Sequence, residues 1–179
     1  MDENYWKDAY KNTWDESSKR EKRLMAYLEK QAGVKCSESG LGAGSSEYIS
    51  GSAARNGYQK GDADFWIEGT NIYIEVTGPL VKSVQPSAPL WFRPDKLNNA
   101  IKNSNHDVFL AHHCMSADLW RVIHIDDDFK QRFGAYQFRV VTPWIRGRQE
   151  RYVEIETNDR CIRDLDYLVE YLKNQRGCQ

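Results

Sequence analysis

The stretch that decides the fold of this chain is residues 63–79, which read ADFWIEGTNIYIEVTGP. Two runs rich in β-branched and aromatic residues flank Glu68–Asn71, whose composition is typical of a turn. The runs Asp64–Ile67 and Ile72–Thr77 are therefore predicted to form a β-hairpin. Because side chains alternate across a strand, its second strand should carry two different faces, with Ile72, Ile74 and Val76 on one and Tyr73, Glu75 and Thr77 on the other.

Helical patterns lie on both sides of this hairpin. Upstream, residues 15–32 are predicted to be a helix whose apolar stripe is Leu24, Met25, Leu28 and Ala32, and residues 2–14 a shorter helix with Trp6, Tyr10 and Trp14 one turn apart. That aromatic stripe should pack on the domain or on a second subunit, so a homodimer is possible; base stacking is the alternative. Residues 37–57, rich in Gly, Ser and Ala, predict a loop with a short strand near Tyr48–Ile49.

The rest of the chain alternates between strand and helix patterns. Downstream of the hairpin we expect a helix over 95–102, strands over 108–112, 119–125, 138–142 and 152–156, and a final helix over about 160–174. With 179 residues the chain suits one domain, residues 1–179. This order of elements predicts an α/β fold with a central mixed sheet flanked by helices.

The composition restricts the setting and the partners. The net charge is −1, so a nucleic-acid-binding surface would have to be local. Four cysteines stand far apart without C-x-x-C spacing, which favours free thiols in a reducing compartment. The first residues do not resemble a signal peptide, and no apolar run is long enough to span a membrane. We expect a soluble, cytoplasmic protein.

Two carboxylates of the hairpin are candidates for chemistry. Asp64 begins one strand and Glu75 lies on its partner, which brings the two side chains close together. Paired carboxylates on rigid strands suit Mg²⁺, which prefers oxygen ligands and keeps waters for a substrate. Asp62 is an alternative to Asp64, which we prefer because its strand follows directly. Glu21 lies on the apolar face of the first helix, where a carboxylate needs a partner or a metal unless it reaches solvent.

These features together resemble the PD-(D/E)XK nuclease superfamily, and most closely its small resolvase-like members. In that family a first helix carries a Glu seven residues before a buried Leu, as Glu21 precedes Leu28 here. A Gly-acid-x-Asp strand follows, then a strand ending in Glu-Val-Lys; Asp64 and Glu75 match the motif acids. The resemblance covers residues 16–125 and implies a restriction-endonuclease-like core, with residues 126–179 as a C-terminal hairpin-helix extension.

The resemblance implies a metal-dependent endonuclease that hydrolyses phosphodiester bonds, most simply in DNA. Asp64 and Glu75 would hold Mg²⁺ or Mn²⁺, with Glu21 supporting the ion directly or through water. The motif lysine, however, is replaced by Thr77. Three alternatives remain: a lysine from elsewhere substitutes (Lys96 first, with Lys82 and Lys60 in reserve), Thr77 positions the water, or the protein is inactive and binds nucleic acid or a protein partner.

Two basic clusters and the histidines complete the candidates. Residues 19–23 predict a solvated basic face of the first helix. Arg146, Arg148 and Arg151 occupy a predicted hairpin turn after Trp144, where they could grip a phosphate backbone. His112 and His113 are adjacent, so in a strand they point to opposite faces, which does not favour a shared zinc ion.

Overall fold

The computed structural model describes residues 3–39, 63–145 and 147–176, and in the first helix it describes the side chains of Thr13 and of residues 15–32 only. Several sequence-based predictions lie outside these residues. They are the strand near residue 48 and the proposed roles of Lys60, Asp62 and Arg146, together with the aromatic stripe that starts at Trp6.

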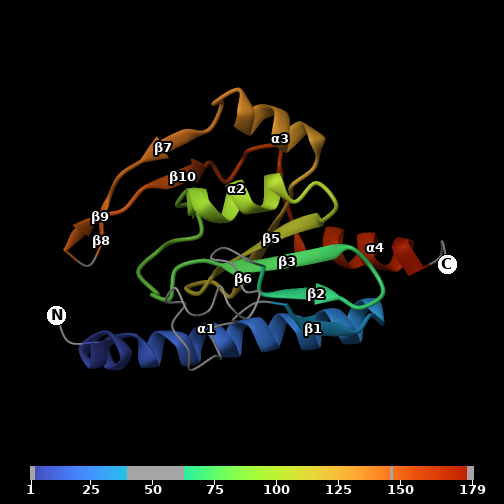
Figure 1. Ribbon diagram of the computed structural model, residues 1–179, viewed down its shortest axis with the longest axis horizontal. Helices are drawn as coiled ribbons and strands as arrows, with labels where there is room; N and C mark the ends of the chain where they lie inside the picture. The colour runs from blue at the N-terminus through green and yellow to red at the C-terminus, as the bar shows by residue number, and fades with distance from the viewer. Residues whose placement is uncertain (1–2, 40–62, 146, 177–179) are drawn as a thin grey trace.

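The described chain contains helices and strands in mixed order (Figure 1). The first half holds α1 (Glu3–Ala32), β1 (Cys36–Glu38), β2 (Phe65–Ile67), β3 (Ile72–Thr77), β4 (Leu90–Phe92), α2 (Pro94–Lys102) and β5 (Asp107–Cys114). The second holds β6 (Leu119–His124), α3 (Asp127–Gly134), β7 (Arg139–Val141), β8 (Trp144–Ile145), β9 (Arg148–Gln149), β10 (Tyr152–Ile155), β11 (Ile162–Arg163) and α4 (Leu165–Arg176).

A six-stranded mixed sheet forms the centre of the molecule, in the order β1-β2-β3-β5-β6-β11. Only β3 and β5 run parallel, and the other neighbours are antiparallel. A parallel pair needs a crossover connection, which β4 and α2 supply. The predicted α/β fold with a central mixed sheet is confirmed.

The β2–β3 hairpin forms as the sequence predicts. Phe65 pairs with Ile74 and Trp66 with Tyr73, and the turn between the strands includes Gly69 at a φ of 77°. Ile72 and Ile74 are buried in one core, whereas Tyr73 packs against a second core on the opposite side of the sheet. The alternation read from residues 72–77 therefore separates the two faces correctly.

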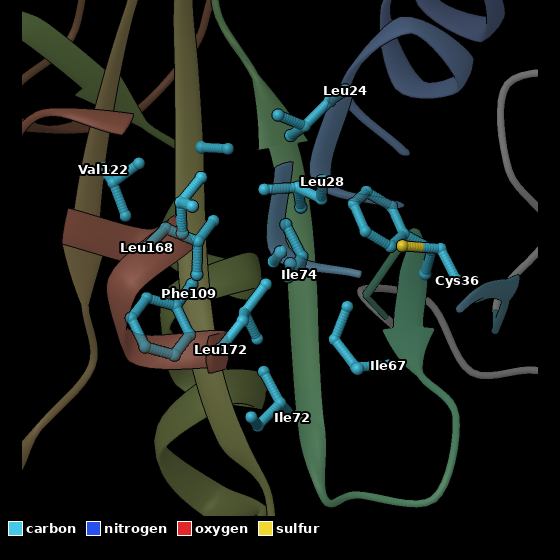
Figure 2. Close-up of a cluster of buried hydrophobic side chains, with 14 residues drawn as sticks. Leu24, Leu28, Cys36, Ile67, Ile72, Ile74, Phe109, Val122, Leu168 and Leu172 are labelled. Carbon is cyan, nitrogen blue, oxygen red and sulfur yellow. The ribbon is translucent and has the colours of Figure 1, made fainter. Parts of the chain in front are cut away.

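One face of the sheet is covered by α1 and α4 (Figure 1). Leu24 and Leu28 of α1 and Leu168 and Leu172 of α4 pack onto the apolar side chains of β2, β3, β5 and β6 (Figure 2). Both helices are needed because the sheet is wider than one helix, which is about 10 Å across. Their joint burial makes the last helix part of the main core.

The opposite face is covered by α2, α3 and a small second sheet of order β4-β10-β7. Leu97 of α2 and Phe129 of α3 meet Leu110 and Ile123 of the main sheet, while β4 and β10 contribute Leu90, Phe92, Val153 and Ile155. With both faces covered, β5 is buried along nearly its whole length.

The strands β8 and β9 form a separate hairpin that extends the path of β7 and β10. Trp144 pairs with Gln149, and the amide of Glu150 donates to the carbonyl of Pro143 at 3.0 Å, which continues the ladder toward the second sheet. We call residues 142–151 the hairpin arm. In Figure 1 the arm projects from the body toward the side on which β3 ends and α2 begins.

The structure differs from the predictions in several elements. The final helix, expected from about residue 160, begins at Leu165, because Ile162 and Arg163 pair with β6 as strand β11. The expected break between residues 14 and 15 is absent from the backbone of α1, which is one continuous helix. Strands β1 and β4 were not predicted, because three residues are too few to give a recognisable strand pattern. They become strands by pairing with β2 and β10, respectively. Helix α3 was not predicted, although Asp126 caps it by accepting a hydrogen bond from the amide of Phe129 at 2.8 Å.

None of the described helices combines the length and the apolar character that a membrane span requires.

Candidate functional site

Asp64 lies immediately before β2 and completes the hydrogen bonding of β3. Its amide donates to the carbonyl of Ile74 at 3.1 Å, and its Oδ2 accepts the amide of Val76 at 2.7 Å. At the start of β2, the carboxylate thus accepts the β3 amide that a backbone carbonyl of a longer β2 strand would accept. Burial raises the pKa of Asp64, although the charge of Lys96 and the Val76 amide oppose this change.

Glu75 lies on β3 and is 7% exposed. Its Oε1 is 2.8 Å from Nζ of Lys96, and its Oε2 is buried without a hydrogen-bond partner among the described residues. Burial and the nearby negative charge of Asp64 raise the pKa of Glu75 to about 8, with a smaller contribution from Glu21 and opposition from Lys96. The charge of Lys96 therefore does not fully offset the burial of Glu75 and the charge of Asp64, and a further cation would stabilise the ionised carboxylate.

Lys96 comes from the first turns of α2. Its side chain is only a quarter exposed and reaches Glu75 on the face of the sheet that α2 covers. Burial acts to lower the pKa of Lys96, but the charges of Glu75 and Asp64 outweigh it and raise the pKa. Lys96 therefore remains a cation next to both carboxylates at neutral pH.

Glu21 approaches the same carboxylates from α1. Its negative charge contributes to the raised pKa of Glu75, which requires the two side chains to be near one another. Glu21 is half-buried, one turn before Leu24, as the helical stripe predicts. Asp64, Glu75 and Lys96, from the start of β2, from β3 and from α2, thus act on one another electrostatically. Glu21 of α1 adds the smallest contribution, and of these three groups only to Glu75.

Whether this site can hold a divalent cation depends on the carboxylate oxygens that could serve as ligands. In the part of the chain that the structure describes, no group of three or more His, Cys, Asp or Glu side chains is arranged to hold a metal ion. Mg²⁺, however, is commonly bound through one or two carboxylates, waters and substrate phosphates. Asp64 and Glu75, with the orphaned Oε2, satisfy that smaller requirement. Glu21 fits better as a support through water.

Arg20 was expected on a solvated basic face, and that expectation is wrong. The guanidinium is buried and donates to the carbonyls of Gly78 and Pro79, both at 2.8 Å. Burial, and to a lesser extent the charge of Arg23, lowers the pKa of Arg20 to about 10. Arg20 lies four residues before Leu24 and therefore on the buried side of the helix. This spacing could have predicted its burial, but the neighbouring charged residues suggested an exposed face.

Gly78 holds the end of β3 against β5. Its φ is 124°, and a Cβ at this position would lie 2.2 Å from the carbonyl oxygen of His113. Only glycine allows this close approach. Together with Arg20, it fixes the backbone that follows Glu75 and Thr77.

Thr77 lies at the end of β3, on the same face as Glu75 and paired in register with His112. It is half-buried, but it has no charge to offer a developing anion. Lys82, in the loop after β3, is exposed. Of the lysine candidates inside the described residues, the one that contacts Glu75 is Lys96.

The histidines point to two sides of β5, as expected. His112 packs edge-on against Phe92, and burial lowers its pKa to about 3, which keeps it neutral. His113 contacts Asp118 at 2.7 Å and Arg23 of α1 at 3.0 Å. The two rings therefore do not share an ion.

The hairpin arm carries exposed cationic and aromatic groups. Trp144 is 71% exposed, and Arg148 and Arg151 are also exposed. Arg148 donates from Nε to Glu150 at 2.7 Å, which orients its guanidinium without burying it. Arg146 lies outside the described residues.

Comparison of the sequence with models of known protein families finds no match, and comparison with curated proteins finds none either.

Proposed function

We propose that this protein is a divalent-metal-dependent nuclease of the PD-(D/E)XK type that hydrolyses phosphodiester bonds in DNA. The observation that carries the proposal is the contact between Lys96 and Glu75, with Asp64 close enough for its charge to alter the pKa of both. A cationic donor beside one buried and one half-buried carboxylate is the set of groups that the resemblance requires, although Thr77 replaces the motif lysine.

The topology supports the same reading. A helix, three antiparallel strands, a crossover with a helix and a parallel strand follow one another as α1-β1-β2-β3-α2-β5, apart from the inserted β4. This order supports the proposal of a restriction-endonuclease-like core, which the sequence resemblance implies. Residues 126–176 add α3, the strands β7 to β11 and α4 around it, and β7 and β10 complete the second sheet with β4.

The residues have separate roles in the proposed reaction. Asp64 and Glu75 would hold Mg²⁺ or Mn²⁺, and such an ion supplies an acidified water and charge stabilisation at a phosphate. Lys96 would align the attacking water and offset negative charge that develops on the phosphate. Burial of Glu75 and Lys96 keeps the dielectric constant low, which strengthens these interactions. The hairpin arm would hold the DNA backbone through Arg148 and Arg151.

A second candidate function rests on the same contact. Lys96 supplies a positive charge to Glu75, so the pair could persist in a protein that no longer binds metal. Such a protein would bind nucleic acid or a protein partner without cutting. Thr77, in place of the motif lysine, favours this alternative.

The two candidates are separated by measuring metal binding and cleavage on the same samples. We expect wild-type protein to bind Mn²⁺ in calorimetry and to nick plasmid DNA, and Asp64→Ala and Glu75→Ala each to lose both activities while circular dichroism shows a folded protein. Glu156→Ala, which removes an exposed carboxylate, is the matched control and should behave as wild type. Full cleavage by either site variant, or absence of metal binding in the wild type, would reject the nuclease.

A further inference from the structure

A cavity of about 220 Å³ adjoins the Glu75–Lys96 pair. It lies between α2 and the β3–β5 part of the sheet. Lys96 and Asn99 line it from one side of the helix, and Asn103 lines it from the position just after the last helical residue. Tyr73, Glu75, Val108 and Leu110 line it from the sheet, and His106 from the loop between α2 and β5. The site proposed for the phosphate therefore opens directly into this cavity.

The size of the cavity limits its ligand. Pockets for drug-sized molecules enclose roughly 300–1,000 Å³, and this cavity is smaller. Its volume corresponds to about seven waters at ~30 Å³ each. One flat ring system fits that space, whereas a base pair does not.

The lining suits a nucleobase in particular. Tyr73 lies in a stack between His106, at a ring-centroid distance of 3.9 Å with planes 13° from parallel, and Trp66, at 6.2 Å. Of the two rings that line the cavity, His106 is the one at the end of this stack, so its outer face is the flat surface left for a heterocycle. The side-chain amide of Asn103 provides both a donor and an acceptor, the combination that reads the edge of a base.

We propose that this cavity binds one unpaired nucleobase of the nucleotide whose phosphate lies at Glu75 and Lys96. The inference rests on the proposed nuclease function and adds a substrate class to it. A base inside a duplex must leave the stack to enter such a cavity, and this costs least when the base is already unpaired. The substrate is therefore DNA with an unpaired nucleotide at the cut, such as a single strand, a flap or a mismatch.

Binding is tested without metal, so that it does not depend on cleavage. Deoxyadenosine, deoxyguanosine, deoxycytidine and thymidine monophosphates, and deoxyribose phosphate without a base, are titrated into the full chain by calorimetry. We expect at least one nucleotide to bind at least tenfold more tightly than the base-free sugar phosphate. Asn103→Ala and His106→Ala should each weaken that nucleotide by about tenfold, the order expected when one amide–base pair or one stacking surface is lost. Asn98→Ala, on the other side of α2 and exposed, should leave it unchanged.

The outcomes distinguish this proposal from the nuclease itself. Equal affinity for nucleotides and sugar phosphate, or nucleotide affinity unaffected in both cavity variants, would overturn the base site even if the wild type cuts DNA. Cleavage of a flap at least tenfold faster than of the matched continuous duplex, with the preference reduced in Asn103→Ala, supports it. If the protein binds the base but does not cut DNA under any condition, the base-binding site would be supported and the nuclease function rejected.

Discussion

At the scale of single residues, Glu75 sets the pH dependence expected of this protein. Its pKa is raised to about 8 in the folded chain, compared with about 4.3 in an unfolded one. The folded state thus binds the proton more tightly, so the stability that this group contributes is complete below about pH 4.3 and is lost as the pH rises through 8.

We predict that wild-type protein loses about 3 kcal/mol of unfolding free energy from this group between pH 6 and 9 in the absence of divalent metal. Glu75→Gln keeps the shape but has no proton to lose, so its stability should rise relative to wild type over that range. Urea unfolding of both proteins at four pH values checks the difference. If the unfolding free energies of the two proteins changed with pH in parallel, the pKa of Glu75 would not be raised in the folded protein.

Lys96 is the residue whose role depends most on the tertiary contact. We predict that Lys96→Ala lowers the rate of DNA cleavage by at least about 100-fold, the loss seen when one charge-stabilising donor is removed from a reaction site. Lys102→Ala removes an exposed lysine from the last turn of the same helix and should leave the rate unchanged. Single-turnover kinetics with saturating Mn²⁺ measures the effect.

Thr77 provides the opposing test. Thr77→Ala removes a hydroxyl but no charge, so we expect a smaller loss than in Lys96→Ala. If the order were reversed, with cleavage abolished by Thr77→Ala and retained by Lys96→Ala, the threonine would be the residue that positions the water.

At the scale of elements, the hairpin arm joins β7 to β10, and none of its described residues belongs to either core. A two-stranded ribbon of this kind is narrow enough to enter the major groove of DNA. The sequence predicted a hairpin turn that carries the arginines, because a turn is specified by residues adjacent in the chain. It did not predict β4, whose three residues become a strand by pairing with β10.

We predict that Arg151→Ala weakens DNA binding by a similar factor for different sequences and reduces the slope of log affinity against log salt by about 0.9, the value for one phosphate contact. Stability should not change, since Arg151 is exposed. Arg163→Ala on β11, at the far edge of the main sheet, is the matched control. An unchanged salt slope in Arg151→Ala would place the DNA elsewhere.

At the scale of the whole molecule, residues 126–179 contribute to both cores. Strand β11 adds an edge to the main sheet, β10 is the centre of the second sheet, and α4 packs beside α1. A segment integrated in this way stabilises the entire fold.

We predict that Leu168→Ala, at a fully buried position of α4, costs about 2–5 kcal/mol of unfolding free energy. Glu170→Ala, exposed on the same helix, should cost less than about 0.5 kcal/mol. Urea unfolding with a single transition for both proteins would be consistent with one cooperative unit. A change below 0.5 kcal/mol for Leu168→Ala would mean that α4 is an appendage.

The sequence by itself determined the β2–β3 hairpin, the division of its residues between two faces, and the helices that carry Glu21 and Lys96. These features follow from periodicity and turn chemistry, which act between residues close in the chain. Only the tertiary structure decided that Lys96 contacts Glu75, that Arg20 is buried against Gly78, and that a cavity lies under Asn99 and Asn103. Each depends on how α1 and α2 pack on opposite faces of the sheet, and that packing is set by contacts between residues distant in sequence.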